Sequence, residues 1–180
     1  MKPPSLHELD DLVIRKLDGA PPAGFDCGRE AQNRFLYDRA WFDQQQRVST
    51  TYLYQSSGIL AAYATVCMDA LVLGTREKPG GLRYKNIASL KLLQLGVHRT
   101  FQNRGLGTLV IFDVVQLALR QSARVGCRYV TLDAQPDLAG WYQSLGFEIN
   151  KVMQKQRIAA AAERAPEEIP VSMRFDLREV

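Results

Sequence analysis

A stretch in the middle of the chain constrains its fold more than any other part of the sequence. Residues 92–107 read Leu-Leu-Gln-Leu-Gly-Val-His-Arg-Thr-Phe-Gln-Asn-Arg-Gly-Leu-Gly. This pattern predicts an apolar strand, a short basic turn and the glycine-rich start of a helix. Free N–H groups at a helix N-terminus attract anions, Gly105 and Gly107 let a ligand come close, and Arg104 adds a positive charge. The stretch therefore predicts a pyrophosphate site, the alternative being an ordinary strand-to-helix turn.

The composition is typical of a globular protein with room for one sizeable core. The chain has 180 residues, of which 46% are hydrophobic and 23% are charged. We expect no membrane contact and no signal peptide, because no apolar run approaches about 20 residues and residues 1–10 lack an apolar segment. The net charge of +4 permits an anionic cofactor or a nucleic-acid substrate and demands neither.

The cysteines favour a reducing compartment. Cys27, Cys67 and Cys127 are scattered and odd in number, so they suggest neither a disulfide framework nor a metal-ligand spacing. We therefore expect a cytoplasmic protein without a metal site.

The hydrophobic pattern predicts an α/β protein with a mixed central sheet flanked by helices. Residues 56–58 indicate a hairpin turn, residues 70–89 a long connection, and residues 159–162 a helical turn. The expected strands are 11–17, 50–55, 59–68, 91–97, 129–134, 147–158 and 169–177, and the expected helices are 26–46, 106–123 and 137–144. We expect a single domain over residues 1–180, with about six to seven strands in its sheet.

Two segments together resemble the GNAT superfamily of acetyl-CoA-dependent N-acetyltransferases. Residues 102–107, Gln-Asn-Arg-Gly-Leu-Gly, match the Q/R-x-x-G-x-G/A pyrophosphate loop of that family. Residues 139–147, Ala-Gly-Trp-Tyr-Gln-Ser-Leu-Gly-Phe, resemble its A-x-x-F/W-Y-x-x-x-G-F stretch. The order of expected elements agrees from Asp11 to Leu177. The resemblance implies the GNAT fold, acetyl-CoA as co-substrate and transfer of an acetyl group to a primary amine.

The resemblance also implies which residues form the site. Tyr142 matches the tyrosine that commonly protonates the CoA sulfur, and a phenol with a pKa of about 10 is protonated at neutral pH; the alternative is a core aromatic. Asp133 or Gln135 would lie near the acetyl or pantetheine end. The residues that would bind acetyl-CoA through backbone groups are Leu95, Gly96 and Val97 for the pantetheine arm, and Gln102, Asn103, Arg104, Gly105, Leu106, Gly107 and Thr108 for the pyrophosphate.

The sequence does not assign a general base for removal of the amine proton. Many family members carry a glutamate on the strand before the loop, where this chain has Gln94. A water chain could remove the amine proton, or the amine could arrive with a low pKa. His98 is either a base or a turn residue, and Cys27 is either a nucleophile at a helix start or a buried side chain.

The N-terminal part resembles a narrower group, the GNAT toxins of toxin–antitoxin modules, which acetylate the α-amine of aminoacyl-tRNA. Residues 25–36 follow their F-x-C-G-x-x-x-L-x-x-x-L start, except that Gln32 replaces the first leucine. Residues 63–65 resemble their G-Y-Y strand, with Ala62 in place of glycine. The resemblance implies charged tRNA as acceptor, an antitoxin partner and, as is common in such proteins, a homodimer. Residues 151–168 depart from the compact ending of those toxins.

A basic loop offers a possible contact for tRNA phosphates. Its cations are Arg76, Lys78, Arg83 and Lys85. The alternative is a solvated loop whose charge is diluted by Glu77. Two other functions stay open: acetylation of a small molecule or a protein N-terminus, and non-catalytic binding of acyl-CoA.

Overall fold

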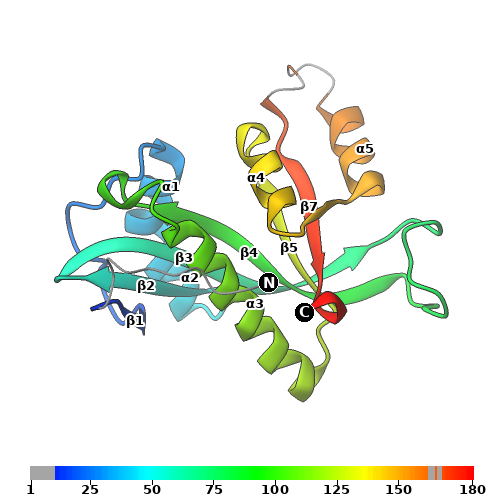
Figure 1. Ribbon diagram of the computed structural model, residues 1–180, viewed down its shortest axis with the longest axis horizontal. Coiled ribbons are helices and arrows are strands. Elements are labelled where there is room, and N and C mark those ends of the chain that lie inside the picture. Colours follow the sequence, from blue (N-terminus) through cyan, green and yellow to red (C-terminus); the bar gives the residue numbers. More distant parts are fainter. Residues whose placement is uncertain (1–10, 162–164, 166–167) are drawn as a thin grey trace. The chain divides into compact units, whose positions relative to one another are not determined.

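The computed structural model, which describes residues 11–161, 165 and 168–180, contains one seven-stranded sheet flanked by helices (Figure 1). Its strand order is β1-β2-β3-β4-β5-β7-β6, which confirms the expected α/β class with a mixed sheet. Antiparallel pairing joins β1 to β2, β2 to β3, β5 to β7, and β6 to β7. The strands are β1 (Val13–Lys16), β2 (Thr50–Ser56), β3 (Ile59–Val72), β4 (Asn86–Val97), β5 (Tyr129–Ala134), β6 (Glu148–Ile149) and β7 (Val171–Asp176).

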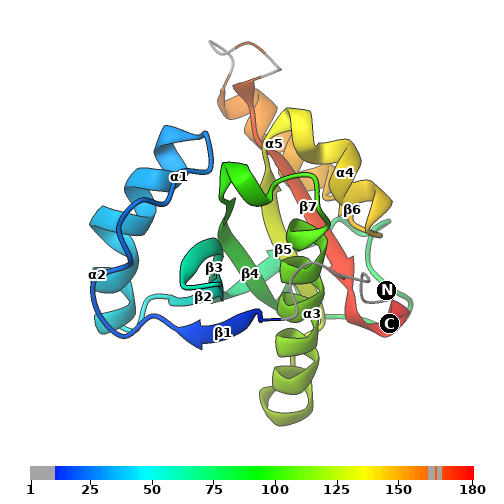
Figure 2. The same cartoon turned by 60° about the vertical axis from the view of Figure 1, so that its left-hand side comes forward.

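The first helical region begins later than the sequence predicts. Gly24 and Gly28 have positive φ angles of 85° and 83°. This left-handed backbone prevents a helix from forming before Glu30. From Glu30 the chain winds through α1, a π-helical turn η1 and α2 without interruption (Figure 2). The helices are α1 (Glu30–Arg34), η1 (Phe35–Arg39), α2 (Ala40–Gln45), α3 (Leu106–Val125), α4 (Ala139–Ser144) and α5 (Lys151–Ala160), with 3-10 turns η2 (Arg99–Phe101), η3 (Pro136–Leu138) and η5 (Leu177–Glu179).

The chain divides into two compact units. The N-terminal unit contains the described residues up to Cys67 together with Leu92–Val114, and the C-terminal unit contains Met68–Lys91 and Val115–Val180. The chain passes between them within β3, β4 and α3. Each unit has its own cluster of buried apolar side chains.

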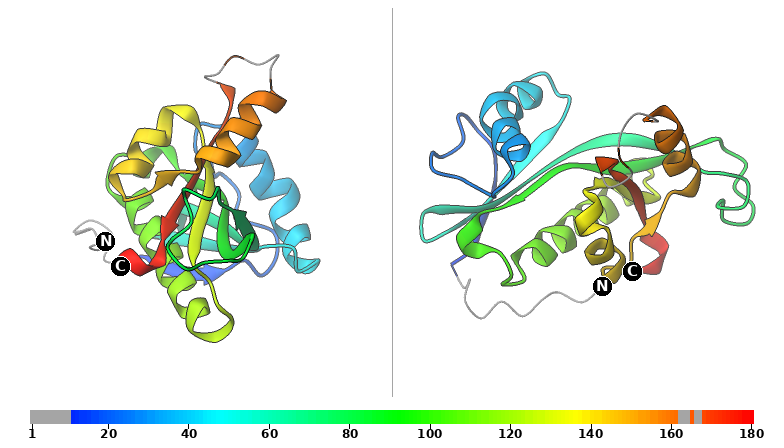
Figure 3. Two further views of the ribbon diagram at one scale, coloured as in Figure 1. Left: turned by 90° about the vertical axis from the view of Figure 1, so that its right-hand side faces the viewer. Right: turned by 90° about the horizontal axis from the view of Figure 1, so that it is seen from above.

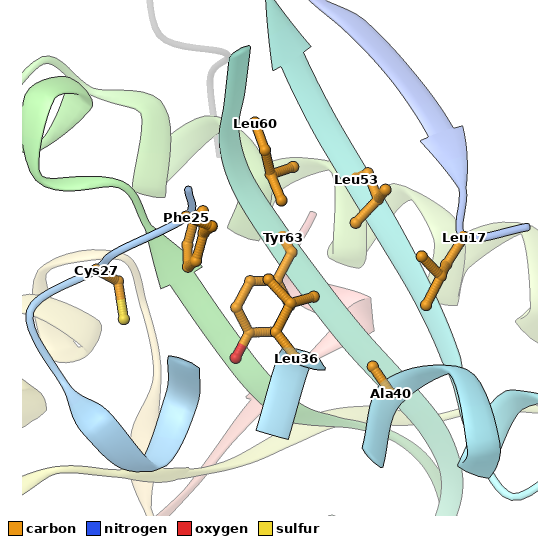
Figure 4. Close-up of a cluster of buried hydrophobic side chains, with 8 residues drawn as sticks. All are labelled: Leu17, Phe25, Cys27, Leu36, Ala40, Leu53, Leu60 and Tyr63. Carbon is orange, nitrogen blue, oxygen red and sulfur yellow. The ribbon is translucent and has the colours of Figure 1, made fainter. Parts of the chain in front are cut away.

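The core of the N-terminal unit joins its helices to β2 and β3. Figure 4 shows Tyr63 on β3 at the centre of this cluster, with Leu36 and Ala40 of the helical segment facing it. The other buried members are Leu17, Phe25, Cys27, Leu53 and Leu60. Burial of such side chains stabilises each by roughly 1.5–3 kcal/mol relative to exposure. The cluster therefore fixes the 25–28 segment to the sheet.

The expected strand at 147–158 is wrong for most of its length. β6 has only Glu148 and Ile149, and α5 follows directly. The residues of α5 are mostly strong helix formers, and Met153 packs against the core of the C-terminal unit. The expected turn at 159–162 is the end of α5 and Ala161, while Ala162 lies outside the described residues.

The connection between β3 and β4 is also shorter than expected, because both strands extend further. Leu71, Leu73 and Ile87 are buried with Tyr129 of β5, and this burial keeps the strands paired to Val72 and from Asn86.

Among the described helices, α3 has the length and average hydropathy that a membrane span needs. Asp113 and Arg120 interrupt its apolar run, and the core helix of a soluble protein meets the same test.

Candidate active site

The predicted sequence of strand, turn and glycine-rich helix start is confirmed in the N-terminal unit. β4 ends at Val97, the turn η2 follows, and α3 begins at Leu106. Between them Asn103 has φ +61° and Gly105 has φ +83°, both in the left-handed region that reverses the chain. Leu109 N–H donates to Gly105 C=O at 3.1 Å, so the N–H groups before Leu109 precede the first helical hydrogen bond. These groups, at the positive end of a 20-residue helix, can receive an anion.

The first residue of the loop acts through its side chain. Gln102 Nε2 donates to Cys27 C=O at 2.9 Å and to Val97 C=O at 2.9 Å. Its backbone N–H donates a longer bond, 3.4 Å, to Arg99 C=O. The amide of Gln102 therefore joins the end of β4 to the 25–28 segment.

A second contact joins the same two segments. Arg99 Nε lies 3.0 Å from Asp26 Oδ2, and Arg99 N–H donates to Asp26 C=O at 2.9 Å. Asp26 Oδ1 accepts Gly28 N–H at 2.7 Å and Asn33 Nδ2 at 2.8 Å. The Gly28 N–H, then Asn33, lower the pKa of Asp26, against a smaller opposing effect of desolvation. Asp26 thus organises its own turn instead of capping a helix.

Cys27 is buried and unsuited to nucleophilic attack. Burial raises the pKa of its thiol, which keeps the sulfur protonated. Its N–H donates to Asn33 Oδ1 at 3.0 Å. The structure supports the interpretation of Cys27 as a core residue.

The packing of two aromatic rings explains Gly96. A Cβ at this position would lie 2.6 Å from Tyr63 Cε1 and 3.0 Å from Phe25 Cζ, which leaves no room for a side chain. Phe25 and Tyr63 meet edge to face at 5.4 Å, and the Tyr63 hydroxyl donates to Gln32 C=O at 2.8 Å. Two residues of the toxin-like segments therefore pack directly on the strand predicted to hold the pantetheine arm.

His98 stabilises the turn after β4. Its N–H donates to Ala61 C=O at 2.8 Å, and its Nδ1 accepts Thr100 N–H at 3.2 Å. The ring also contacts Phe25 and Phe101. These contacts favour the interpretation as a turn residue over that of a base.

Tyr142 lies on α4 in the C-terminal unit, whereas the loop lies in the N-terminal unit. Its side chain is buried, with its ring 4.6 Å from that of Trp141 and 5.7 Å from that of Phe147. Phe147 in turn packs against Phe175 of β7. The ring orientation is therefore fixed by aromatic packing.

Asp133 on β5 is fully engaged by cations. Lys91 Nζ lies 3.0 Å from one carboxylate oxygen, and Arg157 Nη2 lies 2.6 Å from the other. Burial alone would raise the pKa of Asp133, but hydrogen bonds from Arg157 and Lys91 outweigh it, and the pKa is lowered. A carboxylate in this state is a poor proton acceptor. Gln135 is the N-cap residue of η3 and makes no side-chain capping bond there.

The ion pairs of Asp133 with Lys91 and Arg157 make the stability of the folded protein depend on pH. Because the pKa of Asp133 is lower in the folded protein than the roughly 3.9 of an unfolded chain, its stabilisation is present above that value and lost as pH falls through the folded value. We expect Asp133→Asn to lower the thermal unfolding midpoint at pH 7 and to lower it progressively less as pH falls below about 4. Calorimetry of both proteins between pH 2 and 7 measures this, and a pH-independent difference would contradict it.

Comparisons with known proteins agree with this geometry. A protein-family model described as the acetyltransferase (GNAT) family matches residues 24–147, which include the loop and Tyr142. Among solved structures, AtaT complexed with acetyl-methionyl-tRNAfMet has a TM-score of 0.76 at 23% identity, covering 94% of this chain and 96% of that chain. A variant of KacT has a TM-score of 0.75 at 20% identity, covering 93% and 96%.

An AtaT variant bound to acetyl-CoA and the C-terminus of the antitoxin AtaR is similarly close. Its TM-score is 0.71 at 22% identity, with coverage of 94% of this chain and 96% of that chain. At these identities the likeness establishes a shared fold.

Proposed function

The chain belongs to the acetyltransferase (GNAT) family, and we propose that it transfers the acetyl group of acetyl-CoA to the α-amine of an aminoacyl-tRNA. The observation that carries this proposal is the junction between the toxin-like segment and the loop. Gln102 and Arg99 bind the 25–28 segment directly, so the part of the sequence that resembles the toxins is built onto the CoA-binding part. AtaT, which has the same fold, has been solved with acetyl-methionyl-tRNA and with acetyl-CoA.

The residues of the N-terminal unit fit an anionic diphosphate. Left-handed Asn103 and Gly105 open the loop, and the first turn of α3 offers backbone N–H groups. We infer that these groups, from Gln102 to Thr108, hold the pyrophosphate, while Leu95, Gly96 and Val97 position the pantetheine arm. Acetyl-CoA, when bound, supplies the activated acetyl thioester.

The acceptor amine explains why no strong base is needed. An α-amine has a pKa of about 7.7–8.0, so a useful fraction is neutral at physiological pH. This agrees with Gln94 in place of a glutamate and with an Asp133 that is held by two cations. We assign Tyr142 as the proton donor to the leaving thiolate, because it stands at the position of the family's tyrosine and a phenol with an ordinary pKa of about 10 has a proton to donate.

The proposal extends to organisation and partners. We propose that residues 1–180 form a single cytoplasmic acetyltransferase domain with an antitoxin protein as partner, because AtaT has been solved with the antitoxin AtaR. A homodimer is the further expectation.

A free-thiol release assay with acetyl-CoA tests the function. We expect CoA release with charged tRNA and none with uncharged tRNA, and mass spectrometry should find the acetyl group on the amino acid. Release only with small amines or peptides would instead assign the chain to metabolic or protein acetylation. Tight acetyl-CoA binding without release from any acceptor would indicate a non-catalytic binding module.

A further inference from the structure

Glu77 does not dilute the charge of the basic loop, because its side chain points inward. The carboxylate is only 10% exposed and lies 3.1 Å from Arg174 Nη1. Its Oε1 accepts Lys151 N–H at 2.9 Å, and its Oε2 accepts the N–H groups of Val152 and Gly74, each at 3.3 Å. Glu77 therefore binds back to Gly74 at the start of its own loop, accepts the first N–H groups of α5 and neutralises the buried Arg174.

This arrangement leaves the exposed charge of the loop positive. Glu77 is the only acidic residue between Gly74 and Lys85. Since its carboxylate binds the start of α5, the loop cations continue onto that helix, whose Lys151 and Lys155 are exposed. The right-hand view of Figure 3 shows the connection between β3 and β4, drawn in green, projecting beyond α5 in the C-terminal unit. We call residues 74–85 together with these two lysines the basic arm.

An exposed aromatic ring stands among these cations. Tyr84 is 75% exposed, and both neighbours, Arg83 and Lys85, are exposed as well. Single exposed apolar side chains are common on protein surfaces, so the feature that singles out Tyr84 is its place between two exposed cations. Aromatic rings alternating with cations are the arrangement that binds single-stranded nucleic acid, where rings stack on bases and cations neutralise phosphates.

We propose that the basic arm binds the RNA of the acceptor, with its cations on phosphates and Tyr84 stacked on an unpaired base. The proposal rests on the proposed function, in which the acceptor is an aminoacyl-tRNA with a single-stranded 3′ end. An acidic peptide would pair with the cations but would leave the ring between Arg83 and Lys85 unexplained. Within residues 74–85 the one carboxylate, Glu77, is held by Arg174 and by the start of α5, so it repels phosphates less than an exposed side chain such as the neighbouring Glu148 does.

Binding of uncharged tRNA at several salt concentrations tests the arm apart from catalysis. The double variant Arg83→Ala/Lys85→Ala is expected to bind roughly tenfold more weakly at low salt, with a log–log salt slope shallower by about 2. Arg120→Ala/Arg124→Ala is the matched control, because it removes two exposed cations at the end of α3 and changes the net charge equally. The control should bind as the wild type does.

Variants of Tyr84 separate the contribution of ring stacking to tRNA binding from the contribution of charge. Tyr84→Ala is expected to weaken tRNA binding about tenfold without changing the salt slope, and Tyr84→Phe should restore it, since phenylalanine keeps the ring. Equal losses in both Tyr84 variants would overturn the stacking role.

Turnover distinguishes this proposal from the proposed function. In the arm variants, kcat/KM with charged tRNA is expected to fall relative to kcat/KM with an amino acid ester, which lacks RNA. If the wild type acetylates no charged tRNA, the proposed function fails. If the wild type acetylates charged tRNA but the arm variants bind and react with tRNA like the α3 control, the arm proposal is overturned. Binding of polyglutamate, a model acidic peptide, is measured in parallel. Variants that lose polyglutamate binding and keep tRNA binding would also overturn the proposal.

Discussion

Replacing Tyr142 with phenylalanine is expected to lower the turnover number roughly 100-fold or more while acetyl-CoA affinity changes little. The substitution keeps the ring, so the contacts with Trp141 and Phe147 and the fold of α4 remain. It removes only the hydroxyl, which we assign as the donor to the leaving thiolate. A thiolate that leaves unprotonated raises the barrier to acetyl transfer, whereas ground-state binding does not involve that proton.

Thiol release kinetics and calorimetric acetyl-CoA binding measure the two effects separately. Tyr129→Phe is the matched control, because Tyr129 is another buried tyrosine of the C-terminal unit, on β5. It should keep its turnover. Full activity in Tyr142→Phe would make Tyr142 a core aromatic, and a parallel loss of unfolding temperature and binding would make its hydroxyl structural.

The elements of this protein whose structure depends on neighbouring residues can be predicted from the sequence. The strand, turn and helix start around residues 92–107 follow from hydrophobic spacing and from residues suited to left-handed φ angles, and the structure confirms them. The sheet class follows in the same way. Both family motifs are short and contiguous, so they are visible without any knowledge of packing.

The errors arise where distant residues decide the outcome. The strand expected at 147–158 is wrong although the residues of α5 favour a helix by themselves, and Glu77, 74 residues away, adds an acceptor for the first N–H group of that helix. Gln102 reaches Cys27 across 75 positions, and Gly96 is small because Phe25 and Tyr63 occupy the space beside it. No pattern in the sequence indicates that these residues are partners, because only the folded chain brings them together.

Glu77 shows how such a contact can be tested, since Glu77→Ala is expected to destabilise the protein by about 2–4 kcal/mol. The pair it forms with Arg174 is nearly buried, at 10% and 11% side-chain exposure, so its loss leaves an incompletely compensated guanidinium. Arg174 keeps a bond to Asn150 Oδ1 at 3.0 Å and to Glu148 at 2.9 Å, which limits the loss. The start of α5 also loses two acceptors.

Thermal unfolding measures this directly, with an expected fall in midpoint of about 4–16 °C. Glu148→Ala is the matched control, because Glu148 binds the same guanidinium but is 67% exposed. An exposed partner contributes less than about 1 kcal/mol, so the control should lose little. Equal losses in the two variants would contradict a special role for burial. A larger loss at Glu77 would show that its buried bonds to Arg174 and to the first N–H groups of α5 hold the 74–85 loop against the rest of the C-terminal unit.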